Sequence, residues 1–394
     1  MSSSPSPDAI VVGGGIGGAV LAHLLARKDW RVVVLERHQG PPRLTRPEVL
    51  WPRTVERLDT LLPAAARADW ALPLEELRVE QGDRLMVGMT RREFTEAGVQ
   101  PVSTDPSKTR RLLLDHAPFE VRYGVEVTDV LRESNDLPGL RCRVLADDGT
   151  ADWHARWIVG DDGARSRVRA ACGIGLDLHG FPFDLLVTAF AWPEEIPPAV
   201  ARVRVRPPRL RARLALVGLV PLPGAQGIAI LPARPGVETA EIGKALEEWT
   251  AHDPLVARCL GGAPRDAWTR VRPQWGHAER YGLGRIALIG DALHPVSPAG
   301  GQGANMAVAD AVALADALLS GPAATVLERY EARRRPANTR SFRFTRRAVR
   351  FGRLPSWCLE GLLPFLPHVF VWAPGLIPLA LRSASTAFLD DAPA

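Results

Sequence analysis

Glycines and one acidic residue near the start of the chain have the spacing of a dinucleotide-binding site. Residues 13–18 read Gly-Gly-Gly-Ile-Gly-Gly, and Glu36 lies further along. In such a loop Gly13 permits a tight turn, Gly15 lets the backbone approach a pyrophosphate, and Gly18 lets a helix pack on a strand. Glu36 would accept hydrogen bonds from a ribose diol, and an acid there disfavours a ribose phosphate. By itself this motif does not distinguish NAD from FAD.

Three predicted elements position this loop. Residues 9–12 form a short apolar strand, and residues 19–26 have the composition and apolar spacing of a helix. The amino end of that helix would present free N–H groups and roughly half a positive charge to a pyrophosphate. A second strand over residues 31–35 ends at Glu36. The sequence therefore predicts the strand, glycine turn and helix of a Rossmann-like unit.

Two further glycine-containing segments follow predicted strands. Segment 160–169 follows a strand over residues 157–159, and segment 290–305 follows a strand over residues 285–289. The second segment leads into a helical pattern over residues 304–319, rich in Ala, Val and Leu. Backbone N–H groups at this helix start would stabilise the negative charge that a reduced flavin carries near N1. We therefore expect FAD as the resident dinucleotide.

Both segments resemble the downstream signatures of the FAD-dependent aromatic hydroxylases, the family of para-hydroxybenzoate hydroxylase, and the likeness covers about residues 8–336. The resemblance implies that Asp291 binds the ribityl chain of FAD, and that Asp162 lies between FAD and the site where NAD(P)H acts. It also implies that residues 46–50 match the family's mobile-loop segment. Arg46 would then belong to the loop that lets the flavin swing between reductant and substrate; a surface arginine is the alternative.

Two weaker likenesses complete the pattern. Arg110 or Arg111 resembles the family's arginine beside the ribityl chain, and residues 330–336 resemble its closing helix. The expected cofactor-binding residues are Gly13, Gly15, Ile16, Gly17, Gly18, Glu36, Arg37, Arg46, Arg110, Asp162, Gly290, Asp291, Pro298, Gly300, Gly301, Gly303, Ala304 and Asn305. Arg46 and Pro298 are the candidate catalytic residues, and no general acid or base can be assigned. A C4a-hydroperoxyflavin is itself the electrophile, so the protein mainly excludes water and holds the substrate.

The expected fold class is α/β: a Rossmann-like FAD-binding domain interrupted by a smaller, mostly antiparallel β substrate domain, with a C-terminal helical segment. The expected boundaries place residues 1–65, 101–185 and 271–340 in the FAD-binding domain, 66–100 and 186–270 in the substrate domain, and 341–394 in a helical, hydrophobic tail. Strand patterns over residues 201–206, 210–222 and 227–232 predict the substrate-domain sheet. Segments 214–217 and 228–231 suit an apolar pocket wall.

Three arginines on one predicted strand, and His294, are expected to have structural roles. Arg202, Arg204 and Arg206 share one face of a predicted strand. A solvated outer face is the expected role of these arginines, and contact with a substrate carboxylate is the alternative. His294 is expected to be a packing residue with satisfied hydrogen bonds.

Composition limits the compartment and the partners. With 394 residues, 46% of them hydrophobic, the chain can form one large and one smaller domain. Four cysteines without paired spacing and the lack of a basic-then-apolar leader favour the reducing cytoplasm. The net charge of +5 comes mostly from arginines that belong to no nucleic-acid-binding module, so we expect no nucleic-acid partner. The sequence contains no His/Cys cluster of the metal-binding type, so we expect no metal site.

The tail departs from the family pattern. Residues 361–381 are apolar or proline except His368, and a basic stripe at helical spacing precedes them. Prolines in this stretch argue against one spanning helix; they are Pro364, Pro367, Pro374 and Pro378. Two interpretations stay open: peripheral membrane contact or capture of a lipophilic substrate through residues 340–381, or broken helices that cap the substrate domain.

The leading functional hypothesis is hydroxylation or epoxidation of an aromatic or polycyclic hydrophobic small molecule, with NAD(P)H and O2 as co-substrates. An FAD-dependent isoprenoid reductase, which would not consume oxygen, is an alternative. A flavin-dependent halogenase is another, since residues 192–197 approach the Trp-x-Trp-x-Ile-Pro pattern, although Glu194 replaces the second Trp, and Lys28 and Lys108 lie in the wrong contexts. A non-catalytic flavoprotein is the fourth.

Overall fold

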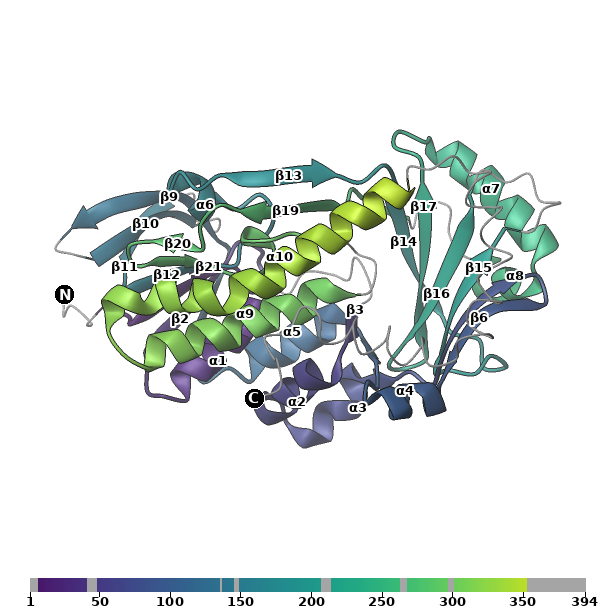
Figure 1. Cartoon of the computed structure of the whole chain (residues 1–394), viewed down its shortest axis with the longest axis horizontal. Coiled ribbons are helices and arrows are strands. Elements are labelled where there is room, and N and C mark those ends of the chain that lie inside the picture. Colours follow the sequence, from purple (N-terminus) through teal and green to yellow (C-terminus); the bar gives the residue numbers. More distant parts are fainter. Residues whose placement is uncertain are drawn as a thin grey trace.

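Two large β-sheets lie toward opposite ends of the molecule, and helices pack against each (Figure 1). The structure, a computed structural model, describes residues 6–40, 48–134, 137–144, 149–206, 214–262, 268–296 and 301–352. One sheet is largely parallel, the other is mostly antiparallel, and a long helix closes the described chain. The predicted fold class is therefore confirmed.

The first sheet has six strands in the order β20-β21-β12-β1-β2-β8. Its strands are β1 (Ala9–Val12), β2 (Val32–Glu36), β8 (Glu120–Tyr123), β12 (Trp157–Gly160), β20 (Gly282–Leu283) and β21 (Ile286–Leu288). All neighbouring pairs are parallel except β20 with β21. Strands β1 and β2 are buried along their whole length, as expected for parallel strands covered on both faces.

Three helices pack together beside this sheet: α1 (Ile16–Ala26), α9 (Gln302–Leu319) and α10 (Val326–Gly352) (Figure 1). Helix α5 (Pro106–Asp115) also contacts α1. Both α1 and α9 begin earlier than the sequence predicted, because Gly15 and Gly301 are their N-cap residues and the low helix propensity of glycine concealed the first turn.

Shorter elements complete this half of the molecule. They are β3 (Glu48–Leu50), β4 (Leu72–Pro73) and β7 (Val102–Thr104) in one small sheet; β9 (Val125–Ser134), β10 (Leu137–Val144) and β11 (Gly149–His154) in another; the ribbon of β13 (Leu176–Gly180) and β19 (Gln274–Ala278); and α2 (Pro52–Leu61), α3 (Arg67–Trp70), α6 (Arg167–Ala171), η1 (Ala64–Ala66), η2 (Gly290–Ala292) and η3 (Ala323–Thr325).

The second sheet has seven strands in the order β18-β14-β17-β16-β15-β5-β6. They are β5 (Glu76–Gln81), β6 (Arg84–Thr90), β14 (Asp184–Ala191), β15 (Val200–Val205), β16 (Leu216–Leu222), β17 (Gln226–Ala233) and β18 (Thr269–Val271). Only β15 with β5 is a parallel pair. Helices α7 (Thr239–His252) and α8 (Pro254–Leu260) cover one face, and α4 (Arg91–Ala97) follows β6 (Figure 1).

We propose that these two sheets mark the two domains predicted from the sequence. Strands β5 and β6 come from the early segment 66–100, and they pair with β15 from segment 186–270. That pairing supports a substrate domain built from two separate stretches of chain. Strand β14 begins at Asp184 and β18 ends at Val271, so we place the boundaries one or two residues outside the predicted ones.

Candidate cofactor and substrate site

The first glycine loop connects β1 to α1, and the N–H groups of Gly13, Gly14 and Gly18 donate to the Leu35 carbonyl, the Glu36 carboxylate and the Asp161 carboxyl group. Gly13 has φ +105°, and a Cβ there would lie 2.4 Å from the carbonyl oxygen of Asp161, so only glycine fits. The first α-helical hydrogen bond runs from the N–H of Ala19 to the carbonyl of Gly15. The N-cap residue Gly15 has no side chain to cap the amino end of α1, where the Asp161 carboxyl group accepts the N–H of Gly18.

Glu36 lies at the end of β2, directly beside this loop. Its Oε2 accepts the N–H of Gly14 at 2.9 Å, and its Oε1 accepts the N–H of His38 at 2.9 Å. The His38 ring nitrogen Nδ1 also lies 2.7 Å from Oε1. The buried carboxylate is therefore fixed at the position predicted for the ribose-binding acid.

A cavity of about 350 Å³ opens at the ends of β1, β2 and β12. Its lining joins the first two glycine segments: Val12, Gly13, Gly14, Gly15, Leu35, Glu36, Arg37, His38, Arg110, Val125, Glu126, Val127, Asp161, Asp162, Gly163, Arg165 and Arg167. Arg110 lines this cavity, whereas Arg111 is exposed and pairs with Asp115. Of the two arginines that the sequence left open, we therefore propose Arg110 as the flavin-side arginine.

The second segment is held by its own polar side chains. Asp162 Oδ2 accepts the N–H of Arg167 at 2.7 Å and that of Val168 at 3.2 Å, so Asp162 caps the start of α6. Arg169 is buried and donates to the carbonyls of Ala292 and Ala164, a role that was not predicted from the sequence. Arg169 thereby ties the second glycine segment to the turn after β21.

The third segment meets the first through α9. The Asn305 side chain is fully buried: its amide donates to the carbonyls of Val49 and Gly301, and its Oδ1 accepts the N–H of Trp51. Asn305 thus fixes the amino end of α9 to β3, so only its backbone is available to a flavin. Ile16, Gly17, Gly303 and Ala304 lie in the first turns of α1 and α9, whereas the sequence pattern placed all but Ala304 in the loops before these helices.

Several predicted residues cannot be placed. Arg46, Pro298 and Gly300 lie outside the described residues, so both candidate catalytic residues stay predictions. Most of segment 340–381 also lies outside them. Within the part of the chain that the structure describes, no helix is both long and apolar enough to cross a bilayer. Arg340, Arg343, Arg346 and Arg347 are exposed on α10, and membrane contact through this stripe stays a hypothesis.

His294 is not merely a packing residue. Its Nε2 contacts Asp310 Oδ2, while Asp310 also accepts the N–H of Gly290 at 3.1 Å and Arg334 Nε at 2.7 Å. Asp310 and Arg334 are fully buried. This cluster links the turn after β21 to α9 and α10, which fixes the start of the third segment. It could not be predicted from the sequence because its members are far apart in the chain.

His277 lies at the edge of this cluster and makes folding sensitive to acid. Burial lowers the pKa of His277 from 6.5 to about 4, with help from His294 and Arg335, while Asp310 opposes the shift. The unfolded chain therefore binds a proton below pH 6.5 that the folded chain refuses until about pH 4. As the pH is lowered from 6.5 to about 4, the free energy of unfolding should therefore decrease by at most about 3 kcal/mol. The free energy of unfolding of His277→Gln, measured with denaturant, should vary less with pH than that of the wild type. His252→Gln, at an exposed site, should show the same pH dependence as the wild type.

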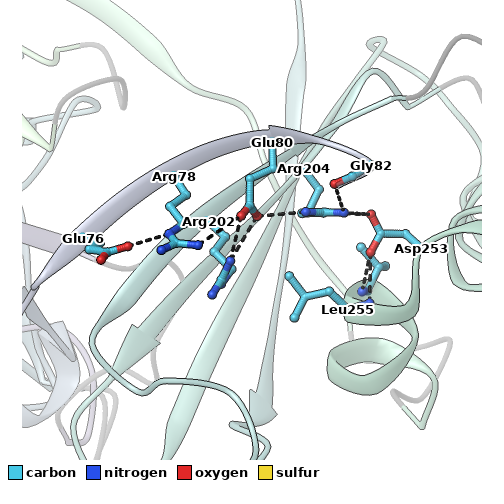
Figure 2. Close-up of polar contacts among 9 residues, drawn as sticks. Glu76, Arg78, Glu80, Gly82, Arg202, Arg204, Asp253 and Leu255 are labelled. Atoms are coloured by element: carbon cyan, nitrogen blue, oxygen red, sulfur yellow. Dashed lines mark hydrogen bonds and ion pairs between the residues drawn. The ribbon is translucent and has the colours of Figure 1, made fainter. Parts of the chain in front are cut away.

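Arg202 and Arg204, two of the three arginines predicted to be solvated, are instead held in ion pairs, and Arg206 lies just past the end of β15. Arg204 is buried, and it bonds to Glu80 and Asp253, each at 2.8 Å, and to the carbonyl of Gly82 (Figure 2). Arg202 bonds the same Glu80 carboxylate at 2.9 Å. The prediction was wrong because α8 covers this face of the sheet and Asp253 caps that helix. These charges join β5 and β15 to α8, on the face of the sheet that α8 covers.

We expect Arg204→Ala to destabilise the protein by about 3–5 kcal/mol, because it leaves the Glu80 and Asp253 carboxylates buried with fewer partners. Thermal or denaturant unfolding measures the loss. The matched control is Arg91→Ala, which removes an exposed ion pair with Glu75 and should cost less than about 1 kcal/mol. Equal losses in the two variants would contradict the buried role.

The opposite face of the second sheet is apolar. Strand register places Val87, Val79, Val203, Gly218, Ile230 and Val187 in one row across six strands, and Met89, Leu77, Ala201, Val220, Ile228 and Ala189 in the next. Leu77 and Met89 pack near Trp51, whose backbone N–H donates to the Asn305 side chain. This face therefore lies toward the amino end of α9. Of the two predicted wall segments, Ile228 and Ile230 belong to it, whereas Leu214 and Val217 pack under α7.

Comparison with known proteins gives concordant results. The family model described as an FAD binding domain matches residues 7–345. Rifampicin monooxygenase of Streptomyces venezuelae is 30% identical over 365 residues, covering 87% of this chain and 71% of that protein. Aklavinone 12-hydroxylase of Streptomyces purpurascens is 30% identical over 388 residues, covering 84% and 66%. The fold matches p-nitrophenol 4-monooxygenase from Pseudomonas putida DLL-E4 with a TM-score of 0.80 at 21% identity, covering 98% of this chain and 99% of that one.

Proposed function

The chain belongs to the FAD-binding-domain family of flavin-dependent monooxygenases, and from this premise we propose that it hydroxylates or epoxidises a large, apolar polycyclic aromatic molecule. FAD supplies the oxidising chemistry when bound, with NAD(P)H and O2 as the co-substrates general to the family. The apolar face of the second sheet carries the proposal. Its two rows contain no ionisable side chain to recognise a small charged substrate.

The residues of this chain would perform three tasks. The glycine loop and Glu36 would hold the adenosine and pyrophosphate half of FAD, and Arg110 with Asp291 would hold the ribityl half. The backbone at the start of α9 would stabilise negative charge on the flavin ring. The rows around Val203 and Ile230 would exclude water and hold the substrate ring by apolar contact.

The relatives' names support a polycyclic substrate. Two of the three proteins compared above are named for rifampicin and aklavinone, and the third for p-nitrophenol.

The alternative functions are less well supported. Trp192, the residue that suggested a halogenase, is buried beneath α7, and its indole N–H donates to the carbonyl of Ile196 at 3.0 Å. That tryptophan therefore has a structural role in the substrate domain. Residence in the cytoplasm stays a prediction.

Oxygen uptake tests the proposal. Purified protein with FAD should oxidise NADH or NADPH at least tenfold faster with a polycyclic phenol than with a monocyclic one, and the product should gain one oxygen atom. Product formed without oxygen uptake would indicate a reductase instead. Val203→Asp places a charge in the apolar wall and should lower kcat/KM at least tenfold with FAD retained. Its control is Leu85→Asp, because Leu85 is already 51% exposed.

A further inference from the structure

Asp161 lies where the three glycine segments meet, although no role for it was predicted from the sequence. Its Oδ2 accepts the N–H of Gly18 at 2.7 Å. A Cβ at Gly15 would lie 2.3 Å from this same oxygen, and a Cβ at Gly290 would lie 2.8 Å from Oδ1. The carboxyl group therefore fills the space that the missing side chains of Gly15 and Gly290 leave open.

A dinucleotide bound at the glycine loop would place its diphosphate next to this position. The second glycine of the motif, Gly15, is the point where the backbone approaches the pyrophosphate, and the amino end of α1 attracts its charge. Asp161 accepts the N–H of Gly18, one of the donors at that helix end that have no partner within the helix. An ionised carboxylate here would repel the phosphates, whereas a neutral carboxyl group could donate a hydrogen bond to them.

The surroundings of Asp161 favour the neutral form. Burial raises the pKa of Asp161 well above its ordinary value, and the charges of Asp291 and Asp162 raise it further. The N–H of Gly18 and the charge of Arg110 act in the opposite direction and do not prevail. The residue is only half-buried in area because part of it faces the cavity, which Glu36, Arg37, Arg165 and Arg167 also line. A bound diphosphate would add two negative charges to those of the neighbouring carboxylates, which also favours the neutral form of Asp161.

We propose that Asp161 binds FAD as a neutral carboxylic acid, accepting the N–H of Gly18 and donating its own proton to an oxygen of the FAD diphosphate. No covalent bond changes in this step: the proton stays on Asp161 and is shared with the phosphate. Binding of FAD is then linked to protonation of this one side chain. The inference depends on FAD binding and not on the substrate proposed above.

The test is a flavin fluorescence titration of flavin-free protein with FAD from pH 5 to pH 9, for the wild type, Asp161→Asn and Asp161→Ala. Asparagine is neutral at every pH and keeps one acceptor and one donor. At pH 5 we expect the wild type and Asp161→Asn to bind FAD equally, and Asp161→Ala to bind roughly tenfold more weakly. Above the pKa of Asp161 in the flavin-free protein, the wild-type Kd should rise tenfold per pH unit while that of Asp161→Asn stays constant.

Two results would overturn the proposal. Weaker binding by the wild type than by Asp161→Asn at pH 5 would show an ionised carboxylate that merely repels FAD. Equal binding by Asp161→Ala and the wild type at pH 5 would show that the side chain does not contact FAD. Thermal unfolding of the three flavin-free proteins shows whether each is folded, and FAD binding by the wild type is the internal check on the cofactor itself.

Discussion

Gly15→Val should reduce FAD affinity at least a hundredfold. A Cβ at this position would lie 2.3 Å from Asp161 Oδ2 and 3.2 Å from its Cγ, so even the first added atom cannot be accommodated without a shift of the loop or of Asp161. The branched side chain would also cover the backbone that a pyrophosphate approaches. The Kd measured by fluorescence titration should rise, and the purified protein should be colourless.

A matched control separates loss of the site from loss of the fold. Gly243 lies in α7, on the far side of the second sheet, and a Cβ there would meet no atom within 4 Å outside the backbone of its own helix and its two chain neighbours. Gly243→Val should therefore bind FAD as tightly as the wild type. Unaltered flavin content in Gly15→Val would show that the diphosphate does not bind at this loop, and the placement of the cofactor would have to be abandoned.

Asp310→Ala should destabilise the protein by about 3–5 kcal/mol, a large fraction of the 5–15 kcal/mol typical of a folded domain. The substitution leaves the Arg334 guanidinium fully buried with its ion pair removed, and it takes the acceptor from the N–H of Gly290. Denaturant unfolding gives the free-energy change. We also expect weaker FAD binding, since the turn that carries Asp291 loses its support.

The pH profile provides a second readout for Asp310. Burial would raise its pKa, but His294 and Arg334 outweigh burial and lower it from 3.8 to about 2. The stabilisation by Asp310 is therefore complete above pH 4 and is lost only as the pH falls toward 2. Asp316→Ala is the control on the same pair of helices, because the Asp316–Arg333 pair is exposed and should contribute less than about 1 kcal/mol. A loss in Asp310→Ala no larger than in this control would refute the buried ion-pair role.

The parts of the molecule that the sequence predicted correctly depend on local patterns. The apolar run of β1, the glycines after it and the acid at the end of β2 lie within 30 residues, and each follows from steric and hydrophobic requirements of a single βαβ unit. The alternating strand patterns within residues 201–232 likewise predicted an antiparallel sheet. Resemblance to a family then joined the three glycine segments into one cofactor site.

Which side chains face one another was decided only by the tertiary structure. Asp161 and Gly18 are 143 positions apart, and Arg204 and Glu80 are 124 apart. Alternation along β15 puts Arg204 on one face and Val203 on the other, but the pattern is the same whichever face meets solvent. Because α8 packs against the arginine face, the charges are buried there in ion pairs, and the valine face lies toward the amino end of α9. A local pattern sets which residues share a face, and long-range packing sets what that face meets.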